Sequence, residues 1–253
     1  MATVIPKTSV ALTSLLRADF TTQWRNRRAV ILTLIVPGII LMSWKSLVAT
    51  VGGPFVLANA ITIGLFASGL MGYSNTVARD RDKGIFQRLR VAPIPSWAII
   101  GSRLLVQVTM IILITTIVFI LGKDYDNISL SPAAYAITYF TAIVGGSVSL
   151  SLGQMIVGFI KNPETVNSTT RLVYIAFILT GIFGEIYMAL NKIDKIIAYV
   201  VKYSPYGTVK TILSTGMEPA KWNIDTSTAL LVTIGYTIVF TFLGIKWFKW
   251  DTK

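Results

Sequence analysis

The sequence predicts an all-α polytopic membrane protein with six transmembrane helices. Hydrophobic residues make up 53% of the 253-residue chain and charged residues only 13%, about half the charged share of a soluble domain. Long apolar runs alternate with short polar stretches, and most runs approach the roughly 20 residues that a membrane-spanning helix needs. The Lys and Arg residues are concentrated in alternate stretches between these runs, which is the pattern that sets membrane topology.

Composition also excludes several classes of function. The chain has no Cys and no His, so it lacks a disulfide framework, the commonest metal ligand and the commonest general base near neutral pH. It contains no Gly-x-x-x-x-Gly-Lys-Ser/Thr phosphate-binding loop. The formal charge of +12 lies between apolar runs, which indicates topology determinants rather than a nucleic-acid surface. We therefore expect no catalytic residue, metal or cofactor on this chain, and no nucleic-acid partner.

The chain divides into an N-terminal segment, 1–28, and a six-span membrane domain, 29–253. In residues 8–28 the side chains of Leu12, Leu16, Phe20 and Trp24 recur every four positions among polar ones, which is typical of a helix lying in the membrane interface. A soluble helix packed on a partner is the alternative. The polar start of the chain does not resemble a signal peptide. The predicted spans are 29–44, 55–77, 99–121, 132–160, 169–190 and 227–248.

The region 191–226 is too interrupted for two further spans. Its apolar residues recur at helical spacing around a break at Ser204-Pro205-Tyr206-Gly207, which predicts two half-buried helices at the membrane surface. Six spans place both termini on one side. That side carries 16 of the 23 Lys and Arg residues, including all ten Arg. The positive-inside rule therefore predicts that both termini are cytoplasmic and that 191–226 is extracytoplasmic.

The loop 78–97 is the most charged interruption in the apolar first half. Ile85, Phe86 and Leu89 are spaced to share one face of a short helix, which could anchor in a groove on another protein. Pro93 and Pro95 would end that helix. The basic residues around it would pair with acids on the partner or with lipid headgroups; they are Arg81, Lys83, Arg88 and Arg90. A solvated loop that serves topology alone is the alternative.

The same loop resembles the first cytoplasmic loop of type-2 ABC exporter permeases. The matching residues are Asp80-Arg81-Asp82-Lys83-Gly84, Leu89 and Pro93, where the family reads acid-x-acid-x-Gly-Thr followed by Glu, Leu and Pro. Here Asp replaces Glu at both acidic positions, Ile85 stands for Thr and Gln87 for Glu. The resemblance covers most of the chain, including the interfacial helix, the Pro205 segment and the closing Phe248-Lys249-Trp250-Asp251. It is closer to the drug and antibiotic-export branch than to the polysaccharide branch.

The resemblance implies the permease subunit of an ATP-driven exporter, not an enzyme. Two such chains, or this chain and a close paralogue, would pair in a bacterial or archaeal cytoplasmic membrane. Each would dock on a separate ABC ATPase subunit that holds Mg-ATP. Coupling to the ATPase would fall to Asp80, Asp82, Gly84, Ile85, Phe86, Arg88, Leu89, Arg90 and Pro93. The substrate path would be lined by Pro37, Gly38, Tyr174, Phe177, Gly181, Phe183 and Tyr187, and the outer gate by Pro205 and Tyr206. Such an aromatic path suits an amphiphilic, drug-like or lipid-like substrate.

Two other functions stay open at this point: an ATP-independent channel or facilitator, and a membrane scaffold without transport. The scarcity of ionisable residues in the spans argues against a proton-driven transporter. Glu185, near the outer end of the fifth span, is the exception. It fits a substrate or coupling residue, or an interfacial carboxylate paired with Lys192 or Lys195.

Overall fold

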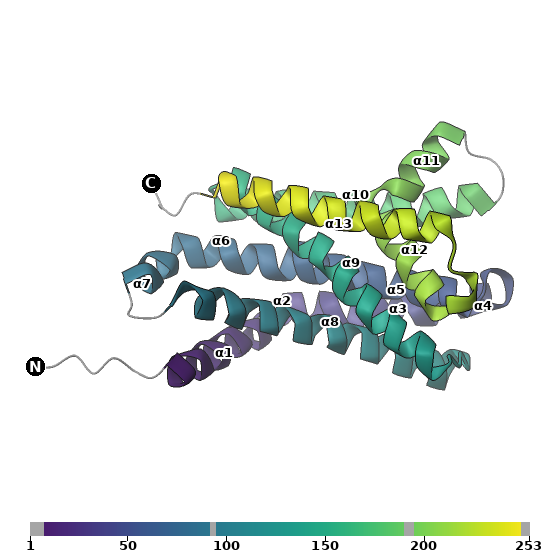
Figure 1. Ribbon diagram of the computed structural model, residues 1–253, viewed down its shortest axis with the longest axis horizontal. Coiled ribbons are helices and arrows are strands. Elements are labelled where there is room, and N and C mark those ends of the chain that lie inside the picture. Colours follow the sequence, from purple (N-terminus) through teal and green to yellow (C-terminus); the bar gives the residue numbers. More distant parts are fainter. Residues whose placement is uncertain (1–7, 92–94, 190–194, 249–253) are drawn as a thin grey trace, which may run out of the picture.

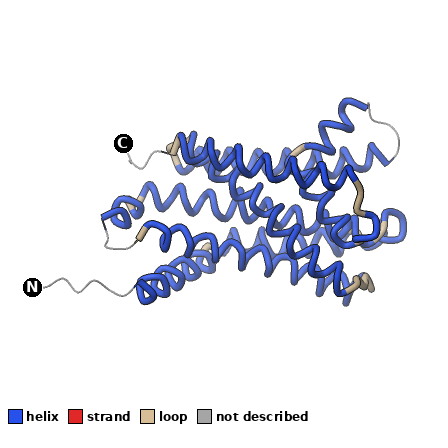
Figure 2. Tube along the Cα trace, in the orientation of Figure 1, coloured by secondary structure: helices blue, strands red, loops and turns tan. Residues whose placement is uncertain are grey.

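The computed structural model describes residues 8–91, 95–189 and 195–248, and these residues form helices joined by short turns, with no strand among them (Figures 1 and 2). The predicted all-α class is confirmed. Pro93, Lys192 and the closing Lys249-Trp250-Asp251 fall outside the described residues.

Several helices are long and apolar enough to cross a membrane. Within the described residues, four qualify by length and composition: Gly53–Asp82, Ala98–Asp126, Pro132–Phe159 and Ile224–Lys246. The pair Thr33–Ser43 and Lys45–Val51, bent by 65°, adds a fifth if it is counted as one span. Helix α10 (Pro163–Ala189) has a similar length of 27 residues. The architecture is that of a multi-pass membrane protein.

The remaining elements connect or interrupt these helices. In chain order they and the spans are α1 (Thr8–Arg25), α2 (Arg27–Val30), the π-helical η1 (Ile31–Ile35), α3 (Val36–Ser43), α4 (Lys45–Val51), α5 (Gly53–Phe66), the π-helical η2 (Ala67–Tyr73), α6 (Ser74–Asp82), α7 (Ile85–Val91), α8 (Ser96–Asp126), α9 (Pro132–Phe159), α10, α11 (Lys195–Tyr203), α12 (Pro205–Met217), the 3₁₀ turn η3 (Pro219–Lys221) and α13 (Ile224–Lys246). Helices α5, η2 and α6 run on as one long helix.

Polar caps and prolines begin several helices where the sequence changes from polar to apolar. The side chains of Ser131, Ser204 and Asn223 each accept a hydrogen bond from a backbone N–H of the first turn that follows, and Asn162 does the same for α10. Proline follows three of these caps, at positions 132, 163 and 205. A proline in the first turn loses no hydrogen bond and has the helical φ already set.

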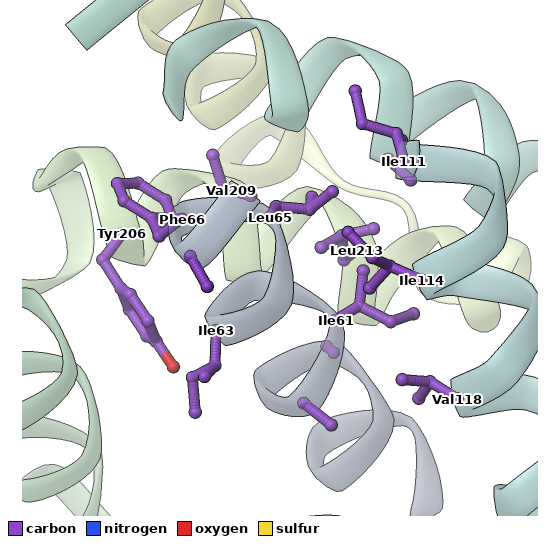
Figure 3. Packing of buried hydrophobic residues seen from close by; sticks show 14 of the residues in the cluster. Ile61, Ile63, Leu65, Phe66, Ile111, Ile114, Val118, Tyr206, Val209 and Leu213 are labelled. Carbon is purple, nitrogen blue, oxygen red and sulfur yellow. The ribbon is translucent and has the colours of Figure 1, made fainter. Parts of the chain in front are cut away.

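The core lies around the long central helix. Along its most apolar stretch 94% of the residues are buried. Figure 3 shows Ile61 and Leu65 of α5 packed among side chains of α8 and α12. A Cβ at Gly69 would lie 2.4 Å from the backbone of Ser149, and one at Gly153 would lie 2.6 Å from the carbonyl oxygen of Gly69. The small residues Gly69, Ser149 and Gly153 thus bring the central helix and α9 into backbone contact.

The two short helices after α10 differ from the prediction of a half-buried pair. Helix α11 projects from the bundle (Figure 1) and exposes Ile196 at 74% and Tyr199 at 64%. Helix α12 is buried instead, with Val209 and Leu213 fully inaccessible. The reason is that α12 packs between α5, α9 and α13, so both of its faces meet protein.

Candidate functional site

Helix α7 is the short helix predicted within the charged loop, and a glycine sets its direction. It lies at the same end of the bundle as the start of α1 and the end of α13 (Figure 1). Gly84 has φ +66° and separates α6 from α7, and its N–H donates to the carbonyl of Arg81 at 2.9 Å. A left-handed residue after a helix is usually glycine, because any other side chain is strained there.

Arg103 of α8 joins α7 to the bundle. Its guanidinium forms a salt bridge with Asp80 of α6 at 2.5 Å, and both side chains are largely buried, 15% and 13% exposed. The same guanidinium lies 4.7 Å from the centre of the Phe86 ring. Phe86 in turn packs edge-to-face on Phe248, with ring centres 5.7 Å apart. Phe86, predicted from the sequence to be an anchor for a partner, therefore packs on its own chain.

Arg81 is buried and bonds within the chain, contrary to its predicted role. The charged loop predicted that Arg81 pairs with a partner's acids or with lipid headgroups, and this prediction is wrong, because the residue is only 3% exposed. It donates hydrogen bonds to the carbonyl oxygens of Val157, Ile160 and Lys161, at 2.7, 2.6 and 2.8 Å. These carbonyls end α9 or follow it, where the helix supplies no donors and carries partial negative charge.

Helix α1 is attached to this end by polar contacts. Ser102 of α8 donates a hydrogen bond to Asp19 of α1 at 2.6 Å, and burial raises the pKa of the Asp19 carboxyl. The side chains of Gln23 and Gln107 are both buried and line the same small hollow as Asp19 and Arg103. A helix thus occupies most of the predicted segment 8–28, and Asp19 connects it to the membrane domain by a hydrogen bond.

The outer surface of α7 carries its exposed residues. Val91 is 85% exposed, Gln87 and Arg88 are exposed, and Ile85 and Leu89 are half-buried. The side chain of Arg90 lies outside the described residues, and Asp82 is exposed. Val91 and Arg103 were not among the residues predicted for this site. An arginine within the predicted third span was the available signal for Arg103, because a charge there needs a partner.

The predicted outer gate and part of the predicted path meet inside the bundle. The hydroxyl of Tyr206 donates to the side-chain oxygen of Asn59 at 3.0 Å, and its ring lies 5.9 Å from that of Phe66 (Figure 3). A Cβ at Gly181 would lie 2.2 Å from the Tyr206 ring, so the glycine makes room for the tyrosine. Phe177 packs edge-to-face on Phe66 at 5.3 Å. Pro205 begins α12 just ahead of Tyr206.

Comparison with known proteins decides the family. The family described as "ABC-2 type transporter" matches residues 10–217. This chain belongs to the ABC-2 type transporter family. Among curated proteins it is similar to "Putative transport permease YvfS" of Bacillus subtilis (strain 168), with 22% identity over 191 residues, 74% of each chain. The protein is thus the membrane component of a transporter and not an enzyme.

Three of the remaining residues predicted to line the substrate path of this ABC-2 protein are buried. Pro37 and Gly38 are buried, and a Cβ at Gly38 would lie 2.9 Å from Leu121. Tyr174 is 6% exposed. Phe183, Glu185 and Tyr187 belong to α10, but their side chains lie outside the described part. The opposite faces of these helices expose two apolar stripes: Ile31, Ile35 and Ile39 on one, and Leu172, Ile175 and Leu179 on the other.

Proposed function

We propose that this chain is the permease subunit of an ATP-driven ABC exporter with six spans, both termini being cytoplasmic. Two copies, or one copy and a close paralogue, pair in a bacterial or archaeal cytoplasmic membrane, and each docks through α7 on a separate ABC ATPase subunit that binds Mg-ATP. One observation carries the proposal: α7 stands at one end of the bundle, packs on neighbouring helices through Phe86, and still exposes an apolar side chain, Val91, at 85%.

In this proposal the two faces of α7 have different roles. The inner face transmits movement, because Phe86 contacts Arg103 of α8, which is also paired with Asp80 of α6. The outer face binds the ATPase through Val91 and its neighbours; the loop residues given this role are Asp82, Ile85, Arg88, Leu89, Arg90 and Pro93. Gly84 sets the angle at which α7 leaves α6. A short helix with an apolar contact residue fits a groove on a partner.

The proposed substrate path lies on the two exposed apolar stripes. Elements η1 and α10 both contact η2, so the stripes belong to helices that flank the same central helix. A second copy that packs against this face would enclose an apolar path, which suits an amphiphilic, drug-like or lipid-like substrate. Pro37, Gly38, Tyr174, Phe177 and Gly181 would support its wall from behind, and Tyr206 would close its outer end.

The test uses two matched substitutions. Val91 and Ile224 are both 85% exposed, but Val91 lies on α7 and Ile224 begins α13 at another part of the bundle. Burial of a valine contributes about 1.5–3 kcal/mol, so Val91→Asp should weaken binding of the ATPase subunit at least about tenfold. Ile224→Asp should leave it unchanged. Binding is measured by co-purification of the two subunits and by the ATPase rate in proteoliposomes.

The alternative functions give different results. A channel or facilitator would move substrate across vesicles that contain this chain alone, without ATP. A scaffold would bind a partner without stimulating ATP hydrolysis or transport. If Val91→Asp and Ile224→Asp bind the ATPase equally well, α7 is not the docking helix and the proposal fails.

A further inference from the structure

We propose that the hollow between α1 and α6 binds the phosphate group of an anionic phospholipid. The inference rests on the proposed function in one respect, that this end of the bundle lies at the cytoplasmic headgroups. The hollow opens to solvent and has a volume of about 210 Å³. Its lining comes from the last residues of α1 and from the last turns of α6; these residues are Thr22, Arg25, Asn26, Thr76, Arg79, Asp80 and Lys83.

The charge of this hollow is positive and unneutralised. Arg25, Arg79 and Lys83 contribute three cations, and among the described residues none of the three has a carboxylate partner. The one acid in the lining, Asp80, is bound to Arg103. Two guanidinium groups and an ammonium converging on one hollow match the oxygens of a phosphate.

The surroundings favour a lipid over a soluble phosphate. Trp24, next to Arg25, is 48% exposed, and tryptophan is enriched where a membrane meets water. Five residues beyond Asn26, or roughly 7 Å along a helix, Ile31 is 48% exposed and begins an apolar stripe. A phospholipid in the hollow would place its phosphate on the cations and its acyl chains on that stripe.

A lipid bound here would act on the coupling site. Arg79 and Lys83 lie in the turns that lead to Gly84 and α7, whereas Arg25 lies at the end of α1. The phosphate would therefore connect α1 to the base of α7 and hold both at the membrane surface. Coupling to the ATPase would then depend on the anionic lipid content of the membrane.

The experiment compares two triple variants of the full chain. In Arg25→Gln/Arg79→Gln/Lys83→Gln the hollow loses its cations. In Arg17→Gln/Arg171→Gln/Lys246→Gln the same charge is lost from exposed positions outside it. Each protein is titrated in detergent micelles with phosphatidylglycerol or phosphatidylcholine. Bound lipid is counted by native mass spectrometry, and the thermal midpoint is recorded in parallel, because a ligand that binds only the folded state raises it.

We expect the wild type and the control to retain phosphatidylglycerol in preference to phosphatidylcholine, and the hollow variant to bind it about 100-fold more weakly. Equal losses in both triple variants would show unspecific surface attraction and overturn the proposal. Inorganic phosphate is added at about 10 mM, a concentration at which even a weakly binding ligand occupies its site. Displacement of the lipid by this phosphate would assign the site to a soluble phosphate. Unchanged lipid binding with lost ATPase co-purification would assign it to an acidic protein surface. Lipid counting needs no ATPase, so its outcome is independent of the Val91→Asp test.

Discussion

Substitution of Arg81 by glutamine should destabilise the protein more than any exposed charge change on the same loop. The guanidinium donates to the carbonyl oxygens of Val157, Ile160 and Lys161 from a side chain that is 3% exposed. Hydrogen bonds from a charged donor contribute about 1.5–3 kcal/mol each, so the three together set an upper range of roughly 4–9 kcal/mol. Glutamine keeps one donor group and removes the cost of burying a charge. We therefore expect a net loss of about 3 kcal/mol.

The assay is thermal unfolding of the full chain in detergent, followed by the loss of monodisperse protein. A change of 1 kcal/mol shifts the midpoint by about 2–4 °C in a chain of this size, so Arg81→Gln should lower it by about 6–12 °C. Arg88→Gln is the control, because Arg88 is exposed and its one hydrogen bond, to the carbonyl of Lys83, is 3.5 Å long. Arg81→Lys should fall between them, because one ammonium cannot reach all three carbonyls. A midpoint for Arg81→Gln equal to that of Arg88→Gln would refute the reasoning.

Three further substitutions test other parts of the site. Gly84→Ala should lower the free energy of unfolding by about 1 kcal/mol and reduce ATPase co-purification, because φ is +66° at this position. The control is Gly101→Ala in α8, where the added Cβ would contact nothing, and it should change neither quantity. Tyr206→Phe should lower the free energy of unfolding by about 1–2 kcal/mol, seen as a lower thermal midpoint, because the buried Asn59 oxygen loses its donor. Burial raises the pKa of Asp19 above 3.8, so the folded state holds the proton more tightly than the unfolded state. Its stabilising contribution is complete below pH 3.8 and is lost as the pH rises through the folded-state pKa. As the pH rises from 3.8 through the folded-state pKa of Asp19, the thermal midpoint of the wild type should therefore fall relative to that of Asp19→Asn.

Short sequence patterns were enough to predict turns and helix starts that depend on a few neighbouring residues. Gly84 marked the turn before α7, Ser204-Pro205 marked the start of α12, and the start of α9 at Pro132 was predicted to the residue. The 65° bend after Ser43 was not predictable, because no proline or glycine stands there and only packing can impose it. The burial of α12 was also hidden, since an apolar face at helical spacing looks the same whether it meets lipid headgroups or protein.

In the candidate site, too, some features follow from the local sequence and others only from the packing of the fold. Arg81 looked like a solvated charge because it stands in a run of charges. Helix α6 continues through Asp82, however, and Arg81 lies four residues after Val77 and seven after Ser74, both buried, so the helical register places it inside. Phe86 stays a predicted coupling residue, but its contacts with Arg103 and Phe248 could not be predicted, because both residues are distant in sequence. Contacts of that kind are a property of the fold and not of any local pattern.

The central helix connects the α7 end of the proposed permease to the region around Tyr206. Its α6 end is fixed to α8 and α9 through Asp80 and Arg81, so a push on α7 cannot be absorbed by bending there. Near its middle, at the last residue of α5, Phe66 packs on Tyr206. Between Phe66 and Asp80 lies η2, and π-helical turns of this kind occur frequently at functional sites. Backbone contact with α9 at Gly69 prevents η2 from moving sideways. A displacement of α7 should therefore reach Tyr206 as a change in the winding of η2, and not as a tilt of the whole helix.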